Sequence, residues 1–213
     1  MSYKITILTD RGSWVNKYID EYIEGVAFPI KKIFNYEDIR EGDFLFILGY
    51  TKIIGVNYLL KNKHNLVVHA SALPKGKGWS PLTWQILEGE NEIPITLFEA
   101  SKEVDAGMIY FQDIMKFNGT ELVEELRNVL GKYTMNLCQS FIDTYPQCVQ
   151  NGKMPVGEGT FYSRRTPKDS QLNIHETIKN QFNLLRVVDN EKYPAFFVYK
   201  ENKYKIEISK CDE

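Results

Sequence analysis

Two side chains suited to acid–base chemistry stand at the ends of predicted strands. His69 ends the apolar run Asn65–His69 and opens a loop that contains proline and glycine. Asp105 lies in the polar turn Ala100–Gly107, which joins two further predicted strands. A carboxylate beside an imidazole can orient the ring or take up a proton. We therefore predict that His69 and Asp105 form a catalytic pair, provided that the fold brings them together.

Each of these residues also has a purely structural interpretation. A histidine at a strand end can simply be held by a neighbour, and an aspartate in a turn commonly bonds its own backbone. The two other histidines, His64 and His175, are expected to be structural or exposed. No histidine–cysteine ligand set is visible, so we expect no metal. The cysteines, which lack the CxxC spacing of zinc sites, are Cys138, Cys148 and Cys211.

Alternating strands and helices would position this pair. The expected strands are Tyr3–Thr9, Ile30–Phe34, Asp43–Leu48, Asn65–His69, Ile93–Glu99 and Met108–Gln112. The expected helices are Trp14–Ile23, Ile53–Leu60, Leu82–Leu87 and a long one from Thr120 through Phe141, with Thr120 as its N-cap. This alternation predicts an α/β fold with a Rossmann-like, mostly parallel sheet and helices on both faces. Ligands of such sheets bind beyond the carboxyl ends of the strands, where His69 stands.

The chain divides into two predicted parts. Its 213 residues suffice for one domain with a small appendage. The polar, glycine-containing stretch after residue 150 favours a linker. Beyond it we expect a helix over His175–Arg186 and two strands, Ala195–Tyr199 and Lys203–Ile208. We predict a catalytic domain over residues 1–150 and, over residues 151–213, a linker with a small helix and β-hairpin packed on that domain.

Composition and charge argue against several classes of protein. The 26 basic and 28 acidic side chains give a formal net charge of −2, so no basic field indicates a nucleic-acid partner. With 43% apolar residues the chain can build a core, which argues against disorder. No apolar run reaches the roughly 18 residues that would suggest a membrane span, so we expect no membrane partner. The first residues, with charges at Lys4 and Asp10, resemble a strand and not a signal peptide, so we expect a cytoplasmic protein.

The centre of the chain contains an ordered series of residue types that includes the histidine, a leucine-proline pair, a threonine-bearing strand and the aspartate. The series is His69, Ser71, Leu73, Pro74, Gly78, Pro81, Thr96, Asp105 and Gly107. In order and spacing this segment resembles the family of formyltransferases that use N10-formyltetrahydrofolate. A second segment, YSRRTPKDSQLN followed by LLRVVDNEKYPAFF, is most similar to the sugar N-formyltransferases, which act on nucleotide-linked amino sugars.

The resemblance implies the reaction. A formyl group passes from N10-formyltetrahydrofolate to the amino group of a nucleotide-linked amino or aminodideoxy sugar, and tetrahydrofolate leaves. His69 is then expected to donate a hydrogen bond or a proton to the oxyanion. Asp105 would hold the ring and, through water, take up the amine proton. The resemblance further implies a role in bacterial surface polysaccharide synthesis, such as that of O-antigen.

One position departs from the family pattern. The family has an asparagine two residues before the histidine, and this chain has Val67. Asn65 stands four residues from His69, roughly 13 Å along an extended strand, so it is no easy replacement. Three interpretations stay open: Ser71 or backbone N–H groups supply the missing donor, His69 acts alone, or the chain is a catalytically inactive relative.

The resemblance also implies where the substrates lie. The pterin is expected against two segments, with contacts to Ile47, Leu48, Gly49, Lys52, Ile53, Ala100, Ser101, Glu103 and Val104. The sugar nucleotide is expected at Ser71, Lys75, Lys77, Gly78, Trp79, Arg164 and Arg165. Lysine and arginine recognise phosphate, and a tryptophan can stack on a base or cover the sugar. Ordinary strand-end packing and solvated surface are the alternative interpretations of these residues.

Several rival functions share parts of this pattern. A methionyl-tRNA formyltransferase carries a further tRNA-binding domain, which we do not expect in this acidic chain. Glycinamide ribonucleotide as acceptor would leave the C-terminal segment unexplained, and a formyltetrahydrofolate hydrolase usually has an added regulatory domain. A non-catalytic folate- or nucleotide-binding module is the alternative of a different class, suggested by Val67.

Some properties stay open at this point. The sequence does not distinguish GDP, dTDP and UDP as the nucleotide, nor does it identify the sugar or the position of its amine. The aromatic segment Tyr193–Phe197 suits either a homodimer surface or the core.

Overall fold

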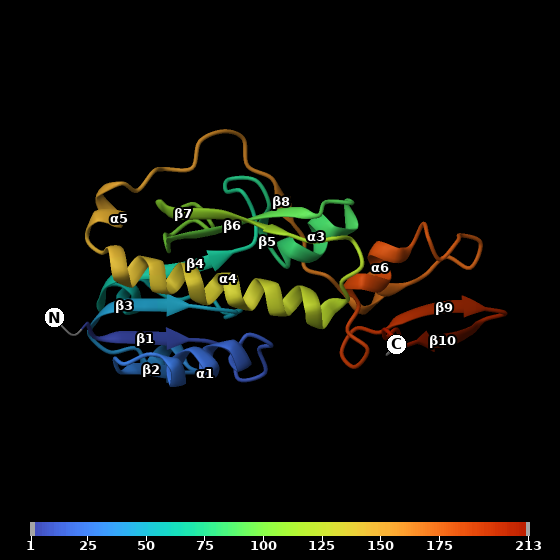
Figure 1. The fold of residues 1–213 in the computed structure, drawn as a ribbon, viewed down its shortest axis with the longest axis horizontal. Helices are drawn as coiled ribbons and strands as arrows, with labels where there is room; N and C mark the ends of the chain where they lie inside the picture. Colours follow the sequence, from blue (N-terminus) through green and yellow to red (C-terminus); the bar gives the residue numbers. More distant parts are fainter. Residues whose placement is uncertain (1–2, 212–213) are drawn as a thin grey trace.

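The computed structural model describes residues 3–211 and is built around a six-stranded sheet (Figure 1). Its strands are β1 (Ile5–Leu8), β2 (Ile30–Ile33), β3 (Gly42–Ile47), β4 (Asn62–His69), β6 (Glu92–Glu99) and β7 (Ile109–Lys116), in the spatial order β2-β1-β3-β4-β6-β7. The first four are parallel, whereas β6 runs antiparallel to both β4 and β7. The predicted Rossmann-like, mostly parallel sheet is thus confirmed, with one reversed strand that the alternation pattern does not reveal.

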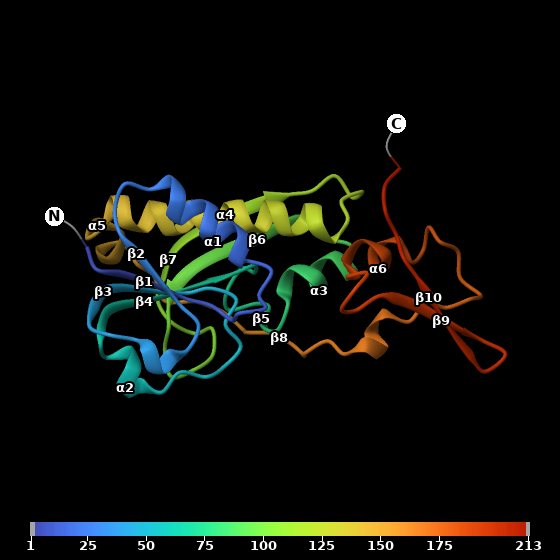
Figure 2. The same ribbon diagram turned by 90° about the horizontal axis from the view of Figure 1, so that it is seen from below.

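Helices cover both faces of this sheet (Figure 2). On one face lie α1 (Asn16–Gly25) and α4 (Val123–Thr144), and on the other lies the short α2 (Val56–Leu59). Strand β3 explains the arrangement, because Phe44 and Phe46 belong to the core cluster under α1 and α4, whereas Leu45 and Ile47 belong to the cluster under α2. A strand buried on both faces is apolar throughout, which is why this segment has no polar alternation.

Helices α1, α2, α4 and α6 (Phe182–Val187) begin two to seven residues later than expected, and at α4 and α6 polar side chains bond the backbone before the helix. Helix α4 starts at Val123, where the Glu125 carboxylate accepts the N–H of Leu122 at 2.9 Å. The hydroxyl of Thr120, the predicted N-cap, instead donates to Asn118 Oδ1 at 2.7 Å. The predicted helix His175–Arg186 shrinks to α6 (Phe182–Val187). Side chains before this helix accept hydrogen bonds from backbone N–H groups, as Gln181 Oε1 does from Asn173, and such bonds favour turns over a helix.

The C-terminal part forms a small structure beside the end of the sheet (Figure 1). It consists of α6 and the antiparallel hairpin of β9 (Ala195–Tyr199) and β10 (Asn202–Ile206), packed around a core cluster of its own. The predicted helix and hairpin are therefore present, and β10 is shorter than the expected Lys203–Ile208. A division of the chain near residue 150 stays a prediction.

A buried arginine joins this part to the sheet domain. The guanidinium of Arg186 is fully buried and donates to Glu121 Oε2 at 3.1 Å and to Asn91 Oδ1 at 3.0 Å. Glu121 stands just before α4, so these contacts attach α6 to the start of the long helix.

Within residues 3–211, no helix combines the length and the apolar character needed to cross a membrane.

The segment between the two parts is not a free linker. After the short α5 (Gln147–Gln150), the chain returns along the sheet and forms β8 (Phe161–Tyr162), which pairs in parallel with β5 (Lys77–Gly78). Strand β5 belongs to the loop that follows His69, and α3 (Pro81–Leu87) comes directly after it. The predicted linker therefore contacts the loop next to the candidate catalytic histidine.

Candidate active site

His69 and Asp105 meet at the carboxyl end of β4. His69 is the last residue of that strand, and Asp105 lies in the loop between β6 and β7. Their closest atoms, His69 Nε2 and Asp105 Oδ2, are 3.8 Å apart, and the two side chains are only 10% and 12% exposed. This separation exceeds a hydrogen bond, but it lies within the 4.0 Å that an ion pair spans.

The main chain of one loop holds both side chains. His69 Nε2 lies 2.8 Å from the carbonyl oxygen of Gly76, and the N–H of Gly78 donates to Asp105 Oδ2 at 2.9 Å. Because a carbonyl oxygen only accepts, Nε2 must carry the hydrogen in this arrangement. Nδ1 then carries the lone pair of the neutral ring. Within residues 3–211 it has no hydrogen-bond partner, and it is not sealed from solvent.

Local backbone geometry turns Asp105 towards the histidine. Asp105 adopts a left-handed conformation with φ of 51°, which aspartate tolerates better than most residues. Two residues later, a Cβ atom built on Gly107 would lie 1.7 Å from the carbonyl oxygen of Glu99. Only glycine therefore lets the chain return this close to the end of β6. The Ala100 N–H, which donates to Asn65 O at 2.6 Å, ties the start of the same loop to β4.

The pair opens into a cavity of about 1290 Å³. Every residue predicted to contact the pterin lines this cavity, namely Ile47, Leu48, Gly49, Lys52, Ile53, Ala100, Ser101, Glu103 and Val104. Of the residues predicted to contact the sugar nucleotide, Gly78, Trp79, Arg164 and Arg165 line it as well. One continuous space thus joins the candidate catalytic pair to both predicted binding segments.

Three of the predicted substrate residues do not line this cavity. Ser71 is 1% exposed and lies beneath the loop, where its carbonyl oxygen accepts the Thr96 hydroxyl at 2.6 Å. Lys75 is exposed, and Lys77 is held in β5 by its pairing with β8. The loop folds inward around Gly76, which places these side chains under it or outside it. The Ser71 hydroxyl is buried without a hydrogen-bond partner within residues 3–211, and Ser71 does not line the cavity.

Arginine and aromatic side chains gather at one end of the cavity. The Arg164 guanidinium lies 4.8 Å from the ring centroid of Trp79. Arg165 donates to Asp169 O at 2.9 Å, but its Nε is buried and has no partner within residues 3–211. Burial lowers the pKa of Arg165 below its usual value, although Asp169 works against the shift. Tyr193 lines the same cavity, whereas its sequence pattern suits either a dimer surface or the core.

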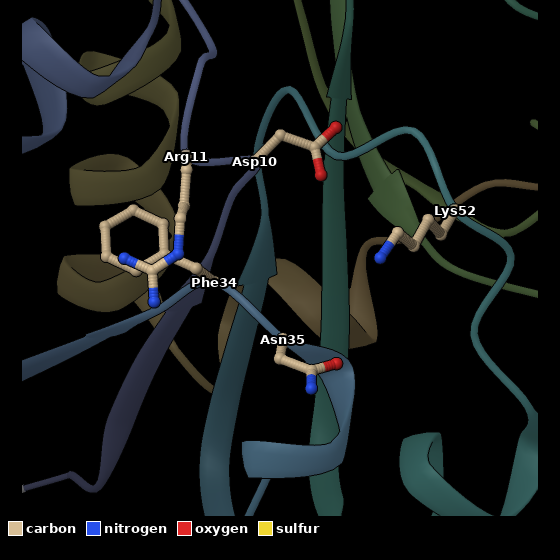
Figure 3. Close-up of a pocket in the computed structure, with 5 residues that line it drawn as sticks. All are labelled: Asp10, Arg11, Phe34, Asn35 and Lys52. Atoms are coloured by element: carbon tan, nitrogen blue, oxygen red, sulfur yellow. The ribbon is translucent and has the colours of Figure 1, made fainter.

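A smaller hollow of about 410 Å³ adjoins the cavity and shares Asp10 and Lys52 with it (Figure 3). Arg11 covers the ring of Phe34 at 4.6 Å from its centroid, and the Lys52 side chain points towards the same space as that of Asn35. Asp10 Oδ2 accepts both the N–H and the hydroxyl of Thr51. Within residues 3–211, neither Arg11 nor Lys52 forms an ion pair with a carboxylate.

The position of Val67 matches the sequence expectation. Val67 lines the cavity two residues before His69 and carries no donor. The side chain of Asn65 is buried, and its amide nitrogen donates to Leu59 O at 3.0 Å. Asn65 is therefore engaged elsewhere and does not supply the amide. Among the described residues, no group of three or more histidine, cysteine, aspartate or glutamate side chains is arranged to hold a metal ion.

The fold and the site together define an α/β domain with a neighbouring histidine and aspartate at the carboxyl end of a central strand. Residues 32–140, just over half of the chain, match the family profile described as formyl transferase. The protein belongs to the formyltransferase family. This membership confirms the resemblance that the residues around His69 and Asp105 indicate.

Individual relatives share this fold at low sequence identity. A methionyl-tRNA formyltransferase of Thermodesulfovibrio yellowstonii is 27% identical over 168 residues, which cover 77% of this chain and 53% of that protein. The chain spans between about a quarter and just over half of the length of the curated relatives it matches.

Among solved structures, the methionyl-tRNA formyltransferase of Clostridium thermocellum has a TM-score of 0.78 at 20% identity and covers 98% of this chain and 94% of that one. A 4-N formyltransferase of Francisella tularensis has a TM-score of 0.72 at 17% identity, with 98% and 99% covered. HypX of Aquifex aeolicus, solved with tetrahydrofolic acid, has a TM-score of 0.74 at 14% identity, with 98% and 38% covered. At these identities the likeness shows a shared fold.

Proposed function

We propose that this protein transfers a formyl group from N10-formyltetrahydrofolate to the amino group of a nucleotide-linked amino sugar. The observation that carries the proposal is the single cavity in which His69 and Asp105 lie together with both predicted binding segments. Two substrates must occupy one space for a direct group transfer, because the amine has to reach the formyl carbon. The proposed products are an N-formylated sugar nucleotide and tetrahydrofolate.

The hydrogen-bond pattern of His69 suggests how protons move. The amine nitrogen attacks the formyl carbon, forms the new C–N bond and gives a tetrahedral oxyanion with a positive nitrogen. We assign His69 Nδ1 as the base that takes the proton from this nitrogen, because Nε2 already donates to Gly76 O. Asp105, 3.8 Å away, stabilises the resulting imidazolium. The proton then passes to N10 of the folate as the C–N10 bond breaks and the oxyanion collapses to the formamide.

This scheme differs from the expectation that His69 mainly donates to the oxyanion. In the scheme, donation to the oxygen follows proton uptake, because Nδ1 bears a hydrogen only in the imidazolium. Val67 leaves the asparagine position without a donor. The charge of the imidazolium is therefore the principal stabilisation that we assign to the oxyanion.

The folate is proposed to occupy the part of the cavity between residues 47–53 and 100–104. Main-chain groups there suit the edge of a pterin, and tetrahydrofolic acid is bound by HypX, which shares the fold. Folate also carries carboxylates at the end remote from the pterin. Lys52, with Arg11 beside it in the smaller hollow, offers positive charge for them.

The sugar nucleotide is proposed to bind at the arginine end of the cavity. Arg164 and Arg165 supply guanidinium groups for a diphosphate, which they can recognise in a bidentate manner. Trp79, already stacked against Arg164, offers a flat surface for the base or the sugar.

The exposed Tyr199 and Tyr204 of the hairpin are the proposed homodimer surface. The proposed location of the protein is the cytoplasm.

Methionyl-tRNA is the second candidate acceptor, because both a sequence relative and a structural neighbour are methionyl-tRNA formyltransferases. The net charge of −2 favours the sugar nucleotide, since proteins that grip nucleic acid gain affinity from basic surface. A non-catalytic folate-binding module is the alternative that would make neither product.

One assay separates these functions. The protein is incubated with N10-formyltetrahydrofolate and, in separate reactions, with GDP-, dTDP- and UDP-linked amino sugars, with methionyl-tRNA or with no acceptor, and tetrahydrofolate release is followed. We expect release with one class of nucleotide sugar and a formylated sugar by mass spectrometry. Release with methionyl-tRNA alone would assign the second candidate. Folate binding without release in any reaction would assign a binding module.

A further inference from the structure

We propose that strand β8 is part of the catalytic apparatus and that Thr160 is a positioning residue for His69 and Asp105. Thr160 touches neither side chain directly. It acts through the loop Gly76–Gly78, to which both are hydrogen-bonded. This inference rests on the proposed function, because it concerns the geometry of the same pair.

Thr160 holds the loop at two consecutive residues. Its hydroxyl oxygen accepts the N–H of Gly76 at 2.8 Å, and its carbonyl oxygen accepts the N–H of Lys77 at 3.0 Å. The next bond of the ladder joins the Trp79 N–H to Tyr162 O at 3.0 Å. The hydroxyl contact is the one that a side-chain substitution can remove while the main-chain ladder remains.

The same two glycines contact the catalytic pair from their other side. The N–H of Gly76 donates to the Thr160 hydroxyl, and the carbonyl oxygen of Gly76 accepts a hydrogen bond from His69 Nε2. Gly78 lies in the strand pair with β8 and gives its N–H to Asp105. A displacement of this loop would therefore change the hydrogen bonds of both catalytic side chains at once.

The loop fits against β8 without spare room. Gly76 and Gly78 have φ values of 70° and 94°, which only glycine adopts without strain. A Cβ atom on Gly78 would lie 2.5 Å from Tyr162 O, and one on Gly76 would lie 2.8 Å from the Cβ of Ser71. The loop is thus packed closely against β8 at Gly78 and against Ser71 at Gly76. The Thr160 hydroxyl opposes a movement of the loop away from β8.

Strand β8 is itself fixed by contacts that do not involve Thr160. The Tyr162 hydroxyl donates to Glu88 Oε2 at 2.6 Å, and its ring stacks on Trp84 at a centroid distance of 6.1 Å. The Trp84 indole N–H donates to Ser163 O at 3.0 Å. Removal of the Thr160 hydroxyl is therefore expected to leave β8 in place on α3 and to loosen only the loop.

The position of β8 in the chain adds a consequence for substrate binding. Arg164 and Arg165, the proposed diphosphate ligands, follow β8 after one residue, Ser163. One continuous segment thus holds the proposed acceptor site and the loop that orients the catalytic pair. An acceptor bound to the arginines is in this way kept in register with His69 and Asp105.

The test compares Thr160→Val, which keeps the shape and loses the hydroxyl, with Thr160→Ser, which keeps the hydroxyl. Thr177→Val is the matched control, because Thr177 Oγ1 also accepts a backbone N–H, that of Asn180 at 3.2 Å, in an exposed turn outside the cavity. We expect Thr160→Val to lower kcat about 10- to 100-fold, since misplacement by about 1 Å has effects of this size. The KM of both substrates should change less than about threefold, and the melting temperature should stay near that of the control.

Two further measurements distinguish a positioning role of Thr160 from a general disturbance of the structure. Thr160→Ser should recover most of kcat. In the ¹⁵N NMR spectrum of the free protein, the His69 ring should change from the Nε2–H tautomer towards a mixture in Thr160→Val, because Nε2–H loses a fixed acceptor. An unchanged kcat and tautomer in a folded Thr160→Val variant would overturn the inference, as would a loss of activity that serine does not restore.

The NMR measurement needs no substrate, so it also distinguishes this inference from the proposed function. If the wild-type protein formylates no acceptor but Thr160→Val still changes the tautomer of His69, the proposed function fails and the positioning role stands. If the protein is active and the tautomer and kcat are both unaffected, the positioning role fails alone.

Discussion

The carboxylate of Asp105 lies 3.8 Å from the imidazole of His69, and it accepts a hydrogen bond from the main-chain N–H of Gly78. The carboxylate thus acts on the ring through charge, while a carbonyl oxygen fixes the tautomer. This division of roles makes the two residues unequal.

Loss of the charge of Asp105 should cost less than loss of the imidazole. Asp105→Asn keeps an oxygen for the Gly78 N–H, and we expect kcat to fall about 100-fold, within the range of acid–base contributions. His69→Asn should reduce kcat about 1000-fold or more. Because Asp105 acts through the ring, the double variant should be no worse than His69→Asn alone. A double variant much slower than both single variants would show that Asp105 also acts directly on the substrate.

Val67→Asn should raise turnover. The substitution places an amide donor on the cavity wall two residues before His69, in a chain that lacks one there. An oxyanion donor contributes on the order of 100- to 1000-fold in other enzymes, and we expect at least about a tenfold rise in kcat from this one. Single-turnover kinetics would measure it, with Val67→Leu as the control that adds bulk without a donor. A folded Val67→Asn variant with unchanged or lower kcat would mean that another group already fills this role.

Arg165→Ala should weaken binding of the sugar nucleotide and leave folate binding intact. Charge-assisted hydrogen bonds contribute roughly 1.5–3 kcal/mol, so the KM of the acceptor should rise about 10- to 100-fold. Lys168→Ala is the control, because Lys168 is exposed nearby and does not line the cavity. Equal effects of the two substitutions, or a rise in the KM of folate, would contradict the placement of the diphosphate.

Gly107→Ala should reduce activity through the loop that carries Asp105. A Cβ atom at this position would lie 1.7 Å from the Glu99 carbonyl oxygen, so the backbone must move. We expect a loss of kcat of about 100-fold, because the displaced Asp105 no longer reaches Gly78 and His69. Gly25→Ala is the control, since open space surrounds that glycine. Wild-type kcat in Gly107→Ala would show that the loop absorbs the change without moving Asp105.

The joint between Arg186 and Glu121 should make stability depend on pH. Burial works to raise the pKa of Glu121, but main-chain N–H groups of Asn118 and Gly119 and the charge of Arg186 outweigh it, so its pKa lies below the usual 4.5. The stabilisation is therefore complete above about pH 4.5 and is lost as the pH falls through the folded-state pKa.

Glu121→Gln tests this joint by thermal unfolding at several pH values. At pH 7 we expect the variant to be about 2 kcal/mol less stable than the wild type, because a hydrogen-bonded ion pair to a buried arginine is broken. The gap in melting temperature should narrow below about pH 4.5. Glu207→Gln should change little, since its partner Lys205 and Glu207 itself are half exposed or more. A gap that stays constant with pH would contradict the assignment.

Local patterns in the sequence determined much of the fold. The uninterrupted apolar run at Phe44–Ile47 requires a strand buried on both faces, and the helical spacing after Thr120 requires a long helix, although not its first residue. The start of that helix and the length of α6 depended on which side chains bond the backbone, which spacing does not reveal. The direction of β6 was likewise decided by pairing with β4, because both directions leave the same apolar residues buried.

Some features of the candidate site are likewise determined by the sequence, and others by the tertiary structure. The residue types of His69 and Asp105, and the absence of a donor at Val67, are properties of the sequence and indicate the chemistry by themselves. Only the tertiary structure decided that the pair lies 3.8 Å apart, that Ser71 lies beneath the loop, and that Thr160 holds Gly76 from 84 residues away. Contacts between distant segments depend on how strands pair and loops close, so no local pattern contains them.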